Sequence, residues 1–279
     1  MTTIHAISGL PRSGSTLLAA LLRQNPRFST GVVSPLYGLV VALLDQMNSA
    51  REFGGFFDDG RRLSLLRGLF ESCYGGDGDG DGDGDGDGRV AFDTNRMWTG
   101  KTELLRALYP DLKIICCVRD IGWILNSMER ALRRNPLETS KLFEFKSGTS
   151  LYGRIQSLMH TDYGNVGTAL GAMREAWYGD NADMLIVIRY ESLVREPGLV
   201  LAQLYEALNE PLFEHDYAHL DFDAPEYDRQ LGMPGLHRVG TRVEPSSARA
   251  IVPPEVFARY ANLAFWNRTQ DNPHAVRVF

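Results

Sequence analysis

The sequence has little cysteine and no long apolar stretch, and each shortage excludes a class of protein. Among its 279 residues are three cysteines, Cys73, Cys116 and Cys117, two of them adjacent in an apolar run. An odd number of thiols placed in this way predicts a reduced, cytoplasmic protein and not a disulfide framework. Because no run approaches about 18 uninterrupted apolar residues, no membrane span is expected. The first eleven residues contain neither Lys nor Arg, so we do not expect a signal peptide.

The chain also lacks an excess of basic charge. The net charge of −6 arises in one repeat, residues 77–88, where six aspartates alternate with glycine; the remaining 29 acidic residues equal the Lys and Arg in number. Charge therefore gives no reason to expect a nucleic-acid partner. The repeat predicts a low-complexity linker over residues 75–88, since ordered glycine is entropically costly and the aspartates repel one another. It matches a calcium loop only in part, because Gly88 stands where a glutamate is needed.

Strand-like and helix-like patterns alternate along the chain. Two β-branched apolar runs, 111–120 and 184–193, show no apolar–polar alternation, which predicts strands buried on both faces. Further strands are expected at 3–10, 28–34 and 89–95, and helices at 15–26, 35–50, 60–75, 99–110, 121–135 and 198–209. This order predicts one α/β domain over residues 1–279, with three layers and a central parallel sheet.

Three further segments have their own patterns. Residues 135–180 are expected to form a helical cap over the ligand edge of the sheet, with one long helix over 153–178. Residues 211–250 are rich in His, Asp, Pro and Gly and predict either a long ordered active-site loop or a mobile lid. A terminal helix is expected over 256–267.

The stretch GLPRSGST, residues 9–16, resembles a phosphate-binding loop that lacks its lysine. Gly9 and Gly14 have the required spacing between a strand and a helix, but Ser15 stands in the lysine position. Backbone N–H groups at the helix start bind anions, and the loop hydroxyls could add donors. Since the missing lysine would reach β- and γ-phosphates, the loop suits a shorter anion such as a phosphosulfate, bridged by Arg12. The alternatives are a Gly/Ser-rich turn without a ligand and the phosphate-binding loop of a kinase.

A second candidate anion site follows the strand over 111–120. Arg119 comes at its end, and Ser127 lies eight residues on, in the expected helix. Ligands of open α/β sheets bind at the carboxyl ends of strands, so both residues are candidates for a second phosphate. The alternative is a surface pair between Arg119 and Asp120 at the start of the helix.

Together, GLPRSGSTLL, VRDIGWILNSMER and VIRYESLVREP resemble the sulfotransferases that use 3′-phosphoadenosine 5′-phosphosulfate (PAPS), nearest the bacterial and tyrosylprotein types. The resemblance covers residues 4–33, 89–131 and 183–208. It implies a P-loop nucleotide-kinase-like fold and transfer of a sulfuryl group from PAPS to a hydroxyl or amine acceptor. The product nucleotide would be 3′,5′-adenosine bisphosphate (PAP), and no metal would be required.

The resemblance also implies residue roles. Around the 5′-phosphosulfate it places Arg12, Ser13, Gly14, Ser15 and Thr16. It places Arg119 and Ser127 at the 3′-phosphate and Tyr190 against the cofactor. It places Arg96 where relatives carry a lysine that stabilises the transferring sulfuryl group. His237 and Arg238 would lie in a loop that closes over the cofactor.

The general base is not identified by the resemblance. The tyrosylprotein type has a glutamate shortly after the first helix, where this chain has Val32 and Val33. The cytosolic small-molecule type uses a histidine, which the comparable stretch DTNRMW lacks. The candidates for the general base are His237, His160 and Asp93. The alternative for each is a structural or surface residue.

Several alternatives stay open. A kinase of the same fold would need magnesium and a lysine from elsewhere, for which Lys101 is the candidate, and a non-catalytic nucleotide- or anion-binding module would need neither. Four aromatic residues could line an apolar acceptor pocket or simply pack in the core: Tyr37, Phe143, Phe145 and Tyr152. His215 and His219 have the spacing of a metal pair, but no Cys or Glu motif completes it and no metal site is predicted. A homo-oligomer is also left open.

Overall fold

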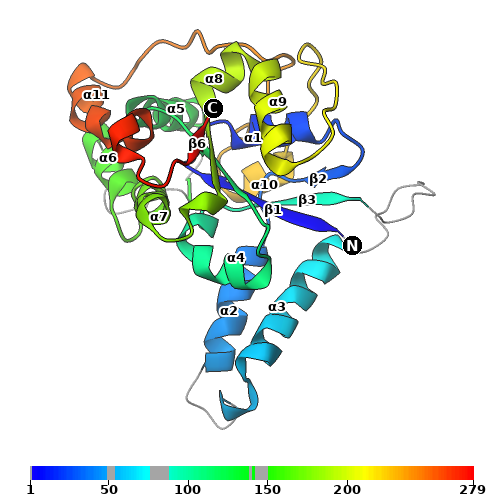
Figure 1. Cartoon of the computed structure of the whole chain (residues 1–279). Helices are drawn as coiled ribbons and strands as arrows, with labels where there is room; N and C mark the ends of the chain where they lie inside the picture. The colour runs from blue at the N-terminus through cyan, green and yellow to red at the C-terminus, as the bar shows by residue number, and fades with distance from the viewer. Residues whose placement is uncertain (1, 49–53, 76–87, 138–139, 142–149) are drawn as a thin grey trace.

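The structure of the chain is a computed structural model that describes residues 2–48, 54–75, 88–137, 140–141 and 150–279. Its centre is a six-stranded sheet in the order β2-β3-β1-β4-β5-β6, with every neighbouring pair parallel. The strands are β1 (Thr3–Gly9), β2 (Phe28–Thr30), β3 (Val90–Thr94), β4 (Ile114–Val118), β5 (Leu185–Arg189) and β6 (Arg277–Val278). The predicted class is thereby confirmed: a three-layer α/β fold of the P-loop nucleotide-kinase-like kind, with a central parallel sheet and a helical cap (Figure 1).

Helices cover both faces of the sheet. They are α1 (Ser15–Leu22), α2 (Leu36–Asn48), α3 (Asp59–Tyr74), α4 (Thr102–Leu108), α5 (Ile121–Arg134), α6 (Leu151–Met159), α7 (Gly167–Tyr178), α8 (Tyr190–Arg195), α9 (Pro197–Leu208), α10 (Pro225–Gln230) and α11 (Pro254–Tyr260). One hydrophobic core cluster packs helices α1, α8 and α9 against one face of the sheet. The other cluster packs the helices from α2 through α7, together with α11, against the opposite face. Helices α2 and α3 extend away from the sheet as a pair (Figure 1).

Strand β4 shows why the sheet needs two layers of helices. Ile114, Cys116 and Val118 belong to one core cluster, while Ile115 and Cys117 belong to the other. Successive side chains of a strand point to opposite faces, so an uninterrupted apolar run is stable only when both faces are covered. The two cysteines are free, buried core residues, as their sequence context predicts.

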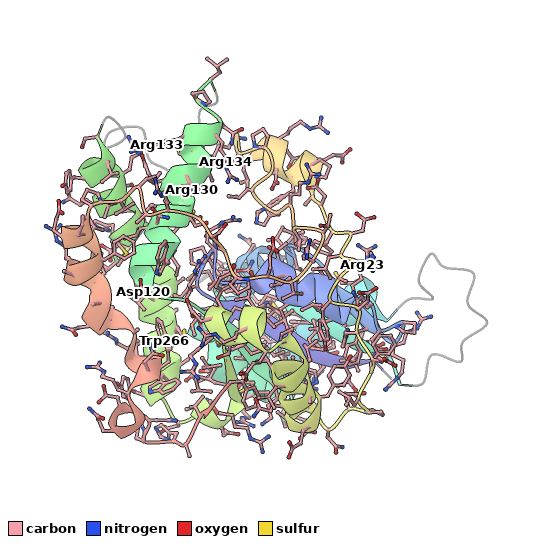
Figure 2. All side chains as sticks on the ribbon, turned by 90° about the horizontal axis from the view of Figure 1, so that it is seen from above. Arg23, Asp120, Arg130, Arg133, Arg134 and Trp266 are labelled. Atoms are coloured by element: carbon pink, nitrogen blue, oxygen red, sulfur yellow. The ribbon has the colours of Figure 1, made fainter. Side chains whose placement is uncertain are left out.

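Helix α5 begins where β4 ends and leads away from the same edge of the sheet. Asp120 caps it, because its side chain accepts a hydrogen bond of 3.1 Å from the backbone N–H of Trp123. Figure 2 shows Arg130, Arg133 and Arg134 along the last turns of this helix. The Arg119–Asp120 segment is therefore a junction between strand and helix, with the aspartate engaged as the cap.

The structure corrects several predicted elements. The single helix expected over 153–178 is two helices, α6 and α7, separated by a turn in which Gly164 N–H donates to the carbonyl of His160. Strand β5 ends at Arg189, so Tyr190 is the first residue of α8. The terminal helix ends at Tyr260 and continues as 3-10 turns, and the short helix α10 and strand β6 were not predicted.

Two predictions concern residues that the structure does not describe. The aspartate–glycine repeat up to Asp87 and the candidate pocket residues Phe143 and Phe145 lie outside the described residues. None of the helices in the described ranges has the length and apolar character that crossing a bilayer requires.

Candidate active site

The carboxyl ends of four strands meet around one cavity. It has a volume of about 640 Å³, and the residues that follow β1, β3, β4 and β5 all line it. A neighbouring cavity of about 410 Å³ shares Arg12, Arg119, Ser127 and Tyr190 with it. Because β1 lies between β3 and β4, its loop leaves the sheet where the strand order reverses, which is where open α/β sheets bind ligands.

The loop after β1 has a backbone that only certain residues adopt. Gly9 and Gly14 have φ values of 99° and 96°, and Arg12 has a φ of 59°. A β-carbon at Gly9 would overlap the backbone of Cys117 in β4. The loop thus passes directly against β4 and turns sharply into α1, which begins at Ser15 with its first N–H groups free of helical partners.

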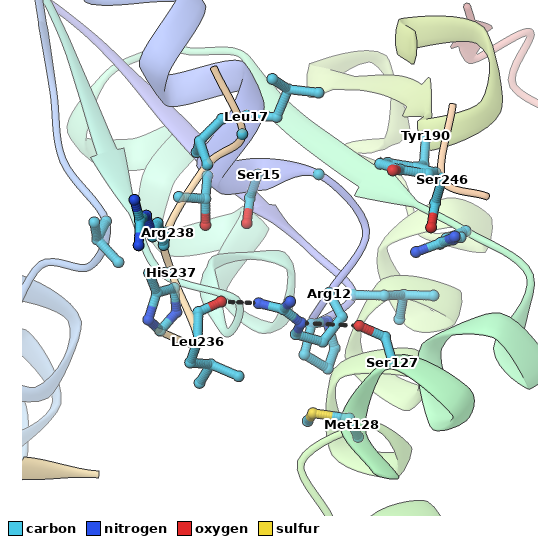
Figure 3. Close-up of a pocket in the computed structure, with 18 of the residues that line it drawn as sticks. Arg12, Ser15, Leu17, Ser127, Met128, Tyr190, Leu236, His237, Arg238 and Ser246 are labelled. Atoms are coloured by element: carbon cyan, nitrogen blue, oxygen red, sulfur yellow. Dashed lines mark hydrogen bonds between the residues drawn. The ribbon is translucent and has the colours of Figure 1, made fainter. Parts of the chain in front are cut away.

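The loop hydroxyls do not all face the cavity. Ser15 (Figure 3) and Thr16 line it. Ser13 is buried, and its Oγ lies within hydrogen-bonding distance of the carbonyls of Leu10 and Cys117. The Ser13 hydroxyl therefore braces the loop against β4, and the donor it could offer an anion is its backbone N–H.

Arg12 extends from the loop across the cavity toward α5. Its Nε donates to Ser127 Oγ at 3.2 Å, and its Nη1 donates to the carbonyl of Leu236 (Figure 3). Burial, with repulsion from Arg119, lowers the pKa of Arg12 to about 10. No carboxylate among the described residues forms an ion pair with Arg12, so its hydrogen bonds go to neutral oxygens, and the nearby charge of Asp228 offsets the desolvation only in part.

Arg119 packs beside this cation. Its guanidinium carbon lies 4.0 Å from the ring centroid of Tyr190, and its Nε lies 3.9 Å from Glu191 Oε1. The same Nε is buried without a hydrogen-bond partner in the described part of the chain. Burial lowers the pKa of Arg119, and the neighbouring Tyr190 and Glu191 oppose that change. Arg119 thus keeps donors available for a ligand.

Arg96 enters the same cavity from the end of β3. Its carbonyl accepts a bond of 2.9 Å from Ser8 Oγ, which fixes the turn after the strand, and its Nη1 donates to Asn165 Oδ1 at 2.9 Å. Burial lowers the pKa of Arg96, an effect that Tyr227 opposes. Arg12, Arg96 and Arg119 therefore converge on one cavity from three strand ends.

The segment after α10 closes the cavity on the side away from the sheet. His237 and Arg238 line it (Figure 3), and so do residues 244–248. The His237 side chain is 19% exposed, and its Nδ1 lies 2.5 Å from Oδ1 of Asp228, a residue with no exposed side-chain surface. The backbone N–H of His237 donates to the other oxygen of Asp228 at 2.9 Å.

The other two candidate bases do not line either cavity. Asp93 is buried, and its carboxylate accepts hydrogen bonds from Tyr74 and Trp98. The His160 ring stacks on Tyr163, with 3.7 Å between ring centroids. Of the three candidates, His237 is the one that the structure places beside the anion loop.

Other candidates from the sequence also lie away from the cavities. Tyr37 packs against Trp98, and Tyr152 is half-exposed and bonded to Glu255. Lys101 lines neither cavity. His215 is buried against Tyr205 while His219 is exposed and paired with Asp216, and the described ranges contain no group of three or more metal-ligating side chains.

Several cavity residues were not singled out from the sequence. Among them are Thr94, Asn95, Arg130, Arg134 and Ser246, and Asp228, which lies behind His237, was also not singled out. Arg130 and Arg134 follow Ser127 by one and two helical turns. On a helix that the sequence already predicts, this spacing indicates that the three side chains share one face. Asp228 had no such signal, because only the fold of residues 211–250 brings it to His237.

Comparisons with known proteins agree with the motifs. The profile of the sulfotransferase family matches residues 82–215, a range that contains Arg119 and Ser127 and excludes the loop over 9–16. The resemblance to the sulfotransferases is confirmed by this match. No curated protein matches the sequence.

One solved sulfotransferase structure shares the fold, and further solved structures are less similar. The sulfotransferase domain from the curacin biosynthetic pathway is 19% identical, with 94% of this chain and 97% of that chain covered at a TM-score of 0.59. A sulfotransferase from Alicyclobacillus acidocaldarius is 18% identical, with 83% and 90% covered at a TM-score of 0.49. Retinol dehydratase in a complex with retinol and PAP is 13% identical, with 98% and 82% covered at a TM-score of 0.47. The first of these likenesses shows the fold of this chain.

Proposed function

We propose that this chain, which resembles the sulfotransferases in sequence and fold, transfers a sulfuryl group from PAPS to a hydroxyl or amine acceptor. The observation that carries the proposal is the environment of Arg12. A desolvated guanidinium that is bonded to neutral oxygens is costly, and a bound anion would remove that cost. The loop that presents it has no lysine for a γ-phosphate, so a phosphosulfate fits it better than a nucleoside triphosphate.

The cavity residues divide between the two ends of such a donor. Arg12, Gly14, Ser15 and Thr16, with the backbone N–H of Ser13, would surround the 5′-phosphosulfate at the start of α1. For the 3′-phosphate the residues would be Arg119 and Ser127, with Tyr190 and Arg238 closing the site. The unpartnered Nε of Arg119 and the clustered guanidinium groups support this assignment.

The reaction would be an in-line displacement at sulfur. An oxygen or nitrogen of the acceptor forms the new bond to sulfur, while the bond from sulfur to the 5′-phosphate oxygen breaks and PAP leaves. Negative charge grows on that bridging oxygen, and Arg12 and Arg96 lie in the cavity where they would stabilise it. The cavity side chains would perform these steps by position and charge, with no metal ion.

The setting of the enzyme is part of the proposal. The free thiols of Cys73, Cys116 and Cys117 support a cytoplasmic location. The acceptor would be a small hydroxyl or amine compound, and neither nucleic acid nor a membrane span is needed for its recognition. A homo-oligomer stays a prediction.

The test is calorimetric titration of the chain with PAP and with ATP, each with and without magnesium. We expect PAP to bind without magnesium, Arg12→Ala to weaken that binding by roughly 10- to 100-fold, and the exposed Arg195→Ala on α8 to leave it unchanged. Preference for ATP with magnesium would indicate a kinase and overturn the proposal. PAP binding without consumption of PAPS across a panel of hydroxyl and amine acceptors would indicate a binding module instead.

A further inference from the structure

The segment that closes the cavity contains a histidine and a carboxylate held in one arrangement. Both oxygens of Asp228 accept hydrogen bonds from His237, one from the ring Nδ1 at 2.5 Å and one from the backbone N–H at 2.9 Å. A carboxylate accepts and does not donate, so Nδ1 carries the ring proton. The remaining nitrogen, Nε2, is then the one with a free lone pair, and no hydrogen bond to it is found within the described part of the chain.

We propose that Asp228 is a positioning residue that holds His237 with Nε2 open to the cavity, where Nε2 takes the proton of the acceptor. This inference rests on the proposed function and adds to it the base that the motifs left unassigned. Asp228 is buried and held in place by helix α10. The hydrogen bonds that it accepts from Nδ1 and from the backbone N–H of His237 fix the orientation and the tautomer of the ring.

The proton transfer balances with the sulfuryl transfer. As the acceptor oxygen forms its bond to sulfur, its O–H bond breaks and the proton moves to Nε2, giving an imidazolium beside Asp228. The electron pair of the broken S–O bond stays on the 5′-phosphate of PAP. The imidazolium then loses its proton to solvent, which restores the neutral base.

The charges facing His237 set the pH range of this base. Asp228 and the ring of Tyr227, 5.4 Å away, face it from α10, and Arg12 and Arg96 face it from the ends of β1 and β3. Burial lowers the pKa of His237 below 6.5, the bond to Asp228 opposes that change, and Arg12 and Arg96 reinforce it. Nε2 is therefore unprotonated at neutral pH, and activity should fall as the pH drops through a value below 6.5.

The tautomer can be tested before any acceptor is known. In ¹⁵N-detected histidine spectra of the intact chain, with the His237 signals identified from His237→Gln, we expect a protonated Nδ1 and a bare Nε2. In Asp228→Asn one side-chain oxygen remains. If it keeps the backbone N–H of His237, the amide NH₂ faces Nδ1 and moves the ring proton to Nε2. A wild-type ring with its proton on Nε2 would overturn the proposal.

Kinetics with the first hydroxyl acceptor that turns over provide the second test. We expect Asp228→Asn to keep its PAP affinity within about twofold and to lose roughly 10²- to 10⁴-fold in kcat, with His237→Gln equally impaired and the double variant no worse. Asp228→Glu should recover part of the loss, and the exposed Asp223→Asn should behave as wild type.

The outcomes separate this inference from the proposed function. Additive losses in the double variant, or an Asp228→Asn variant with nearly wild-type kcat, would show that Asp228 does not act through His237. Failure of the wild-type chain to bind PAP would instead overturn the proposed function, and the ¹⁵N spectra would still report the tautomer. A thermal melt of each variant identifies loss of folding. If Asp228→Asn melts at a lower temperature than wild type, Asp228→Glu replaces it in the comparison.

Discussion

Arg119 is held by an aromatic ring and not by a strong ion pair. Its guanidinium lies over Tyr190 at 4.0 Å, while its nearest carboxylate oxygen, on Glu191, is 3.9 Å away. A planar cation fits between a ring and a phosphate in a way that an ammonium group does not. The side chain is therefore positioned for a ligand before the ligand arrives.

Replacing Arg119 should reduce PAP affinity in steps. We expect Arg119→Ala to weaken binding by roughly 10- to 100-fold, because a charge-assisted contact is lost, and Arg119→Lys to fall between that variant and wild type. Calorimetry measures both, with the exposed Arg195→Ala as the control. Wild-type affinity in Arg119→Ala would place the 3′-phosphate elsewhere.

Gly9 and Gly68 make a matched pair for testing the loop. Gly9 has a φ of 99° against the backbone of Cys117, whereas Gly68 lies in α3 with nothing within 4 Å of an added β-carbon. We expect Gly9→Ala to lower the free energy of unfolding by at least about 3 kcal/mol, and Gly68→Ala to raise it by about 1 kcal/mol. Chemical denaturation measures both, and a stable Gly9→Ala would mean that the loop can move away from β4.

At this scale, the sequence could predict that side chains next to strand ends lie together, and the structure places them around one cavity. Arg12 and Arg119 follow recognisable strands within a few residues, Ser15 ends the loop after the first strand, and a parallel sheet brings such positions together. Asp228 could not be predicted, because its partner is nine residues away across an irregular segment. The Ser13 hydroxyl was predicted to face the anion and instead bonds backbone carbonyls, a choice set by loop geometry that residue type does not encode.

At the scale of elements, a buried carboxylate joins α5 to α6. Glu129 is 4% exposed and accepts hydrogen bonds of 2.6 and 2.9 Å from Arg154 and 2.8 Å from Arg133. Burial opposes its ionisation, but the bonds from the two arginines outweigh burial and lower its pKa. The helix that carries Ser127 is thus tied to its neighbour through charge.

Neutralising this carboxylate should destabilise the protein in a pH-dependent way. We expect Glu129→Gln to lower the free energy of unfolding by about 2 kcal/mol at pH 7, because Arg154 loses its paired charge. Since the pKa of Glu129 is lowered on folding, this difference should be full above about pH 5 and shrink as the pH falls through that pKa. Denaturation at pH 7 and pH 3, with the exposed Glu175→Gln as reference, measures it; equal losses at both values would contradict the assignment.

The elements themselves were predictable where the pattern was long and uniform. Strand β4 lies within its predicted range of 111–120, and helix α5 agrees with its range of 121–135, because a fully apolar run and a marked amphipathic spacing follow each other. The expected helix over 153–178 failed because apolar spacing continues through a turn at Gly164 and Asn165. Two-residue β6 is formed by pairing with β5 alone, which no local pattern reveals.

At the scale of the whole molecule, the aspartate–glycine repeat connects two points that already lie close together. The carbonyl of Tyr74 accepts a bond of 3.4 Å from Thr2, and the carbonyl of Arg89 accepts one of 2.9 Å from Thr3. If four residues were left between Tyr74 and Arg89, the five Cα–Cα steps would span up to about 17 Å, which is enough to join these ends. The remaining length of the repeat is not needed to close the chain.

Deleting residues 77–86 should therefore leave stability and PAP affinity nearly unchanged. Gly88 is kept, because its φ is 95° and its carbonyl accepts a bond of 2.9 Å from Arg27. Thermal melting and calorimetry measure the two quantities, and a deletion of the same length within α3 is the destabilising control. A large loss of either quantity would show that the repeat has a structural or binding role.

The central position of β1 bears on how the protein is made. β1 leaves the ribosome before both of its neighbours, and β3 begins only at Val90 and β4 at Ile114. At roughly 5–20 residues per second, translation needs about 5–20 s to supply the first neighbour. During that interval the nascent chain presents an apolar segment with no partner, which is what chaperones bind. The loop that follows β1 thus gains its backbone bond to Cys117 only after β4 has been made.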